Sequence, residues 1–313
     1  MPKLALPLDC DPGKTCFVQK YVDVDPGPDY QDYLCGHASD PGHTGIDFRL
    51  LNVGAASGVV VKAAAPGTVA KTRDGVADKI VETDAEVKAV SSYGLGNAVI
   101  IDHGDGWQTI YGHMHKGSLK VRSGDKVEAG TPLGEIGLSG LTAYAHVHFE
   151  VRHDGKVVDP YTGQTESTAC ATDAAKATAA SLWSADVLAA TASNETRILD
   201  VGFAGSPVAP ADLEAGLTPE AAASATSPGL VFYARGMNMR EGDQMRFVLD
   251  GPAGWGQEHA MPPLDNWKAT YVGFAGRKLK QDRWPAGHYT GRVEIYRSGK
   301  VVATAEGAMD LKE

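Results

Sequence analysis

Two apolar runs meet at a glycine-rich loop in residues 97–111, NAVIIDHGDGWQTIY. β-Branched and aromatic residues are frequent in both runs, 97–103 and 107–111, and the Gly-Asp-Gly at 104–106 supplies a turn. This arrangement predicts an antiparallel hairpin. Similar short runs separated by glycine-containing turns recur from 59 to 158, without a long apolar pattern of helical period. The first half of the chain is therefore predicted to be a β domain.

Several further elements are expected around this hairpin. Residues 59–71 and 125–137 each read as a pair of strands joined by glycine-containing turns, and an alternating strand over 146–152 ends at the turn Asp154-Gly155. Residues 74–92 are polar and charged, and we expect them to form a loop insertion.

The composition changes after residue 160, because residues 171–192 are rich in alanine before short strand patterns return. This change predicts three parts: a β domain over 1–170, an alanine-rich connector over 171–192 and a second β domain over 193–313. Roughly seven short strands in the last part fit an immunoglobulin-like β-sandwich. The expected fold class is mainly β.

Composition and charge exclude several classes of protein. Hydrophobic residues make up 43% of the 313 residues and charged residues 22%, as in globular proteins, which excludes a disordered or collagen-like chain. Asp and Glu outnumber Lys and Arg by 39 to 29, so a basic surface for nucleic acid is not expected. A run of about 18 apolar residues is also missing, so we predict no membrane span.

The four cysteines, Cys10, Cys16, Cys35 and Cys170, favour disulfides and an oxidising compartment. A structural zinc cluster is the alternative, but the sequence holds no C-x-x-C pair. Three pairings are possible, and we expect Cys16 with Cys35 and Cys10 with Cys170. Because disulfides persist in oxidising compartments, we expect the protein to work in the periplasm or outside the cell. Because its first residues lack the apolar core of a signal peptide, the precursor is expected to carry an export signal.

Two short elements could together hold a metal ion: GHTGID at 42–47 and AHVHFE at 145–150. In a strand, His146 and His148 share a face about 7 Å apart, and a bend at Gly45 would bring His43 and Asp47 to one site. A catalytic zinc takes three imidazole or carboxylate ligands and leaves one position to water. One zinc ion is thus predicted on His43, Asp47 and either histidine of the H-x-H pair.

Two histidines remain beside this predicted site: His113 in the element YGHM at 111–114, and the H-x-H histidine that does not bind the metal. Hydrolysis by a metal-activated water needs groups that move protons and stabilise the oxyanion. The remaining histidines can do both.

Residues 43–161 resemble the LytM-like, or M23, metallopeptidases, which include lysostaphin-type and β-lytic-type enzymes. The resemblance rests on the H-x-x-x-D and H-x-H elements and on GDGWQTIYGH at 104–113, VEAGTPLGEIG at 127–137 and DPY at 159–161. Apart from this resemblance, we expect a monomer. The resemblance implies a zinc endopeptidase that hydrolyses peptide bonds of bacterial peptidoglycan. It also implies the residue roles: His43, Asp47 and His148 as zinc ligands, and His113 and His146 as catalytic histidines.

One departure from the family pattern is the approach to the H-x-H pair, SGLTAYA at 139–145, which places Tyr144 at the expected substrate cleft. Three alternatives stay open. A non-catalytic activator of other wall enzymes is disfavoured because all the expected ligand positions are present. A non-heme iron oxygenase could use two histidines and a carboxylate, but two histidines would have no role. A lipoyl-type or biotinyl-type carrier would need a lysine at a hairpin tip, which is missing.

Overall fold

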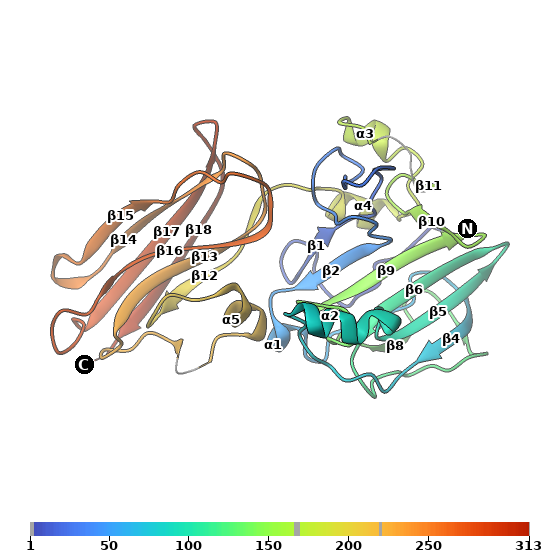
Figure 1. Ribbon diagram of the computed structural model, residues 1–313, viewed down its shortest axis with the longest axis horizontal. Helices are drawn as coiled ribbons and strands as arrows, with labels where there is room; N and C mark the ends of the chain where they lie inside the picture. The colour runs from blue at the N-terminus through green and yellow to red at the C-terminus, as the bar shows by residue number, and fades with distance from the viewer. Residues whose placement is uncertain (1–2, 166–169, 219–220, 313) are drawn as a thin grey trace. The chain divides into compact units, whose positions relative to one another are not determined.

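The computed structural model describes residues 3–165, 170–218 and 221–312. The chain divides into two compact units, Met1–Asn194 and Glu195–Glu313 (Figure 1). Both are built mainly of strands, as expected. No helix in the described ranges is long and apolar enough to cross a membrane.

The first unit is organised around a nine-stranded antiparallel sheet. Its central path runs β1-β2-β9-β6-β5-β4-β7, and β10 and β11 continue from β9. The strands are β1 (Cys16–Lys20), β2 (Ile46–Leu50), β4 (Gly67–Arg73), β5 (Asn97–Gly104), β6 (Trp107–Met114), β7 (Lys126–Val127), β9 (His146–His153), β10 (Lys156–Asp159) and β11 (Gln164–Thr165). The short strands β3 (Val60–Lys62) and β8 (Pro132–Glu135) pair separately.

The hairpin predicted over 97–111 is confirmed, and the strand predicted over 146–152 is β9, which ends at the predicted turn. β5 pairs with β6 across the Gly-Asp-Gly loop, where Asp105 and Gly106 both have positive φ. β9 pairs with β10 across Asp154 and Gly155, which also have positive φ.

The pairings expected within 59–71 and 125–137 are wrong. β3 pairs with β8, whereas β4 pairs with β5 and β7. The reason lies in the link between β3 and β4, where Ala63, Ala64 and Ala65 are fully buried. A hairpin loop runs over the surface, whereas these small residues carry the chain through the core, and the Ala63 N–H donates to the carbonyl of Thr131.

The segment 74–92 is more than a loop, because it contains helix α2 (Asp84–Val90) and a 3-10 turn over Ser91–Tyr93. Thr83 caps α2: its hydroxyl accepts from the Glu86 N–H, and the Glu86 carboxylate accepts from the Thr83 N–H. This capping box is visible in the sequence as T-x-x-E, which is typical of a helix start. The many polar and charged residues of the segment led instead to the prediction of a loop.

The alanine-rich segment 171–192, expected as a connector, packs into the core of the first unit. It contains α3 (Ala174–Ala177) and α4 (Ala185–Thr191), and between them Trp183 is 1% exposed. The Trp183 ring lies 5.3 Å from that of Phe149 in β9 and 5.9 Å from that of Phe48 in β2, measured between ring centroids. Trp183 and Val187 belong to the core of the first unit, and Leu182 packs against it, so the segment is anchored there. A fourth short helix, α1 (Val53–Ala56), follows β2.

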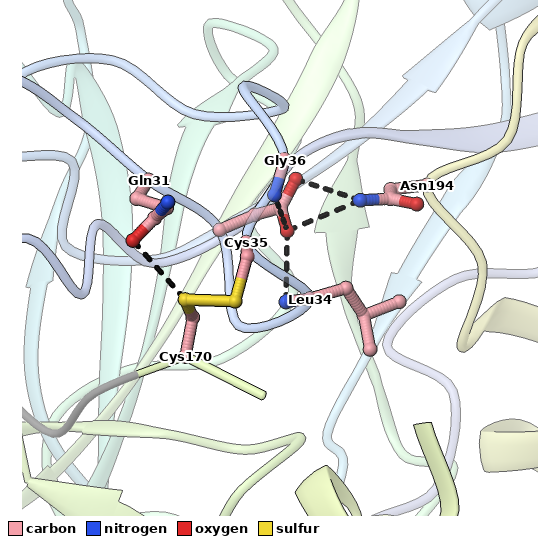
Figure 2. Close-up of a disulfide and its surroundings, with 7 residues drawn as sticks. Gln31, Leu34, Cys35, Gly36, Cys170 and Asn194 are labelled. Atoms are coloured by element: carbon pink, nitrogen blue, oxygen red, sulfur yellow. Dashed lines mark hydrogen bonds between the residues drawn. A yellow bond between two sulfur atoms is a disulfide. The ribbon is translucent and has the colours of Figure 1, made fainter. Parts of the chain in front are cut away.

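The disulfides join Cys10 to Cys16 and Cys35 to Cys170, so the expected pairing is wrong. A tight turn brings the Cα atoms of Cys10 and Cys16 within 6.0 Å. Cys35 lies in a loop organised by Asp32, whose carboxylate accepts from the Leu34, Gly36 and Asn194 nitrogens around the second disulfide (Figure 2). Because the Ala171 N–H donates to the Tyr33 carbonyl, this loop faces Cys170 rather than Cys16.

The second unit consists of two antiparallel sheets around one apolar core. The three-stranded sheet has the order β12-β13-β16, and the four-stranded sheet has the order β15-β14-β17-β18. Phe232 of β13 and Phe247 of β14 both lie in the core between them. The bounds are β12 (Arg197–Ala204), α5 (Pro210–Ala215), β13 (Gly229–Met239), β14 (Gln244–Asp250), β15 (Gly256–Ala260), β16 (Lys268–Lys278), β17 (Gly287–Arg297) and β18 (Lys300–Leu311). This arrangement is a β-sandwich.

Candidate active site

Three neighbouring strands bring the predicted site residues together. β9 lies between β2 and β6, with Asp47 directly opposite His148 and Gly112 on its other side (Figure 1). His146 and His148 share one face of β9, as strand alternation requires. His43 precedes β2 and His113 lies near the end of β6, so all five predicted metal and catalytic residues line one cleft.

The three expected metal ligands converge on one point. Nε2 of His43 lies 3.1 Å from Oδ1 of Asp47, and Nδ1 of His148 lies 3.0 Å from the same oxygen. The three ligand atoms are all within 4.8 Å of one another. Nδ1 of His43 donates to the carbonyl of Tyr21 at 2.8 Å, which leaves Nε2 with a free lone pair. Two imidazoles and one carboxylate are a donor set suited to zinc.

The electrostatics of the site favour a cation. Burial by itself would raise the pKa of Asp47, but interactions with the imidazoles of His146 and His43 and the hydrogen bond with His148 outweigh it and hold that pKa well below its usual value. Burial opposes charge on His148, yet Asp47 and Glu150 raise its pKa to about 9. A positive charge is therefore favoured beside these carboxylates, and the residues fit a divalent metal ion.

A second carboxylate supports His148 from the far side of its ring. Oε2 of Glu150 lies 3.6 Å from Nε2 of His148, and Glu150 is 1% exposed. The hydroxyl of Thr44 donates to the same oxygen at 3.0 Å, and Arg152 pairs with the other. A carboxylate behind a ligand imidazole fixes its orientation. Sequence reasoning missed Glu150, although its alternation with His146 and His148 places it on the same face.

The two remaining histidines have matching arrangements. Nδ1 of His113 donates to the Ser139 carbonyl at 2.8 Å, and Nδ1 of His146 donates to the Tyr144 carbonyl at 2.9 Å. Burial holds the pKa of His113 well below its usual value and lowers that of His146 to about 4. Both rings are thus neutral at neutral pH with an unprotonated Nε2, and their centroids lie 4.6 Å apart.

Tyr144 lines the cleft, and its hydroxyl has a contact that the sequence did not reveal. It donates to Oδ2 of Asp47 at 2.7 Å, and its ring stacks on His146 with centroids 4.4 Å apart. Arg49 lies over the same ring at 5.0 Å. Tyr144 therefore holds the Asp47 oxygen that faces away from His43 and His148.

Residues 41–160 match the model of peptidase family M23. The chain contains an M23 peptidase domain. All five residues of the candidate site lie within this M23 domain.

Two curated relatives illustrate the range of proteins to which the chain is similar. The chain is 32% identical over 119 residues to the DD-carboxypeptidase/endopeptidase Mpg of Neisseria meningitidis, a match that covers 38% of this chain and 22% of the relative. It is 32% identical over 115 residues to the murein hydrolase activator EnvC of Escherichia coli, covering 37% and 23%. The chain thus spans less than a quarter of the length of these relatives.

Among solved structures, the M23 domain is similar to the catalytic domain of a variant of the prophage-encoded M23 protein EnpA from Enterococcus faecalis. The identity is 26%, the TM-score is 0.33, and the match covers 51% of this chain and 93% of that one.

Proposed function

We propose that the M23 domain is a zinc endopeptidase that hydrolyses peptide bonds of bacterial peptidoglycan, with one zinc ion held by His43, Asp47 and His148. The observation that carries the proposal is the convergence of these three ligand atoms within 4.8 Å, in one cleft with two neutral histidines. The similarity to an enzyme named as a DD-carboxypeptidase/endopeptidase supports the choice of substrate.

The protein's own residues account for the proton transfers. Zinc bound by these residues would lower the pKa of a water molecule and polarise the substrate carbonyl. The unprotonated Nε2 of His113 or His146 accepts the proton of the attacking water. The protonated ring then donates a hydrogen bond to the oxyanion and afterwards a proton to the leaving amine. An iron oxygenase would leave both histidines without a task.

We further propose that the protein acts as a monomer in the periplasm or outside the cell. Two disulfides support this location, because such bonds persist in oxidising compartments.

Digestion of purified peptidoglycan tests the enzymatic proposal. The zinc-loaded protein should release muropeptides with new amino termini, detected by mass spectrometry, and a chelator should abolish the release. His113→Ala should keep its zinc, measured by inductively coupled plasma analysis, but lose about 10²- to 10⁴-fold in rate. His148→Ala should lose both zinc and activity. His288→Ala is the matched control, because His288 is an exposed histidine of the second unit.

Full wall-lytic activity in His148→Ala would overturn the zinc mechanism. A zinc-loaded protein that releases nothing, yet stimulates a separate wall hydrolase, would show a non-catalytic activator. EnvC is named as a murein hydrolase activator.

A further inference from the structure

The cleft of the M23 domain has a volume of about 470 Å³ and two chemically different sides. Beside His43 it is polar, with Thr44 and the ion pair of Lys20 and Asp40. The other side is apolar and lies next to His113, whose N–H donates to the Leu95 carbonyl. It is formed by six residues, which we call the apolar wall: Val81, Val87, Gly94, Leu95, Leu141 and Ala143.

The apolar wall carries exposed side chains that are unusual for this unit. Val87 is 40% exposed and Leu141 is 43% exposed. In the described part of the first unit, these two are the only exposed large hydrophobic side chains, and both line the cleft. Apolar side chains concentrated at a cleft beside catalytic groups are typical of a surface that contacts a ligand.

The backbone holds the apolar wall in place beside the catalytic histidines. The Leu141 N–H donates to the Gly94 carbonyl at 2.7 Å, and the Val81 N–H donates to the Thr142 carbonyl at 2.9 Å. The Leu95 carbonyl accepts from the His113 N–H at 2.8 Å. These hydrogen bonds hold the apolar wall in position before a ligand binds.

We propose that the apolar wall is a specificity subsite, which binds an apolar side chain of the substrate residue lying on the His113 side of the cleaved bond. This inference rests on the proposed peptidase function and narrows its substrate to alanyl rather than glycyl peptides. A glycine offers no side chain to cover Val87 and Leu141, whereas a methyl group removes apolar surface of both partners from water. One such carbon in an apolar pocket changes kcat/KM by about 10-fold or more.

The test uses pentaglycine and a set of peptides in which one glycine at a time is replaced by L-alanine or D-alanine. We expect kcat/KM of the zinc-loaded protein to be about 10-fold higher for alanine at one position. Val87→Gln and Leu141→Gln should reduce this preference towards parity. The matched control is Val302→Gln, since Val302 of the second unit is also 40% exposed, and it should leave the preference unchanged.

Equal kcat/KM for all peptides would overturn the subsite, and so would a preference that both wall variants retain. Failure of the peptidase proposal itself looks different, because then no peptide is cleaved at all. In that case the affinities for the same peptides are measured by calorimetry. Tighter binding of an alanine peptide than of pentaglycine, reduced by Leu141→Gln, would support the subsite. Equal affinities for all peptides would overturn it.

Discussion

Asp47 is held through both of its carboxylate oxygens. Oδ1 faces His43 and His148, and Oδ2 accepts from the hydroxyl of Tyr144. We predict that Tyr144→Phe weakens zinc binding by about 10-fold, because the second oxygen of the ligand loses its orienting donor. Competition with a fluorescent chelator measures the affinity. Tyr296→Phe removes a similar phenol–carboxylate contact in the second unit and should change nothing. An unchanged affinity in Tyr144→Phe would show that the hydroxyl does not position Asp47.

Asp159, at the end of β10, is a buried carboxyl outside the candidate site. It is 1% exposed, its Oδ2 has no hydrogen-bond partner among the described residues, and burial raises its pKa to about 7. An unfolded Asp has a pKa of about 3.9. At a pH between these two pKa values, Asp159 is protonated in the native state and ionised in the unfolded state. The free energy of unfolding therefore falls as the pH rises from about 4 to 7. The loss is at most about 4 kcal/mol.

Asp159→Asn should remove this pH dependence. We expect the variant and the wild type to have similar melting temperatures near pH 4, and the variant to be the more stable above pH 7. Thermal unfolding at several pH values measures the difference, with the exposed Asp310→Asn as the control. Parallel profiles for the wild type and Asp159→Asn would contradict the assignment.

At the scale of elements, Gly45 leads into β2 at a point where the chain passes close to β9. A Cβ at Gly45 would lie 2.6 Å from the Phe149 carbonyl oxygen and 2.7 Å from Nε2 of His148. Gly45→Ala should therefore displace the His148 ring, destabilise the protein by about 1–3 kcal/mol and weaken the proposed zinc binding. Chemical denaturation and chelator competition measure the two effects. Gly94→Ala is the control, because its nearest neighbour would be Leu141 Cβ at 4.0 Å. Wild-type values for Gly45→Ala would contradict this explanation.

At the scale of the whole molecule, the two disulfides close loops of very different length. Cys10 and Cys16 are 6 positions apart, whereas Cys35 and Cys170 are 135 apart. Loop-closure entropy predicts a stabilisation of about 2 kcal/mol for the first and about 5 kcal/mol for the second. Replacing each pair by serines and measuring denaturation should therefore show the larger loss for Cys35 with Cys170. Equal losses would indicate that native-state contacts, rather than chain entropy, determine the effect.

Short local patterns in the sequence were sufficient to predict several elements of this protein. The hairpin over 97–111 could be predicted because turn chemistry and strand alternation depend on neighbouring residues. Alternation also placed His146 and His148 on one face, but only the resemblance to the M23 family assigned different roles to these two histidines. The capping box at Thr83 was readable in the same way but was missed.

Only the tertiary structure decided which distant segments meet. It pairs β3 with β8, joins Cys35 to Cys170, buries Trp183 against the sheet and brings Tyr144 to Asp47. Closing a loop costs little more when the loop is longer, so sequence separation alone hardly distinguishes one long-range contact from another. The packing of side chains in the core determines which of these long-range contacts form.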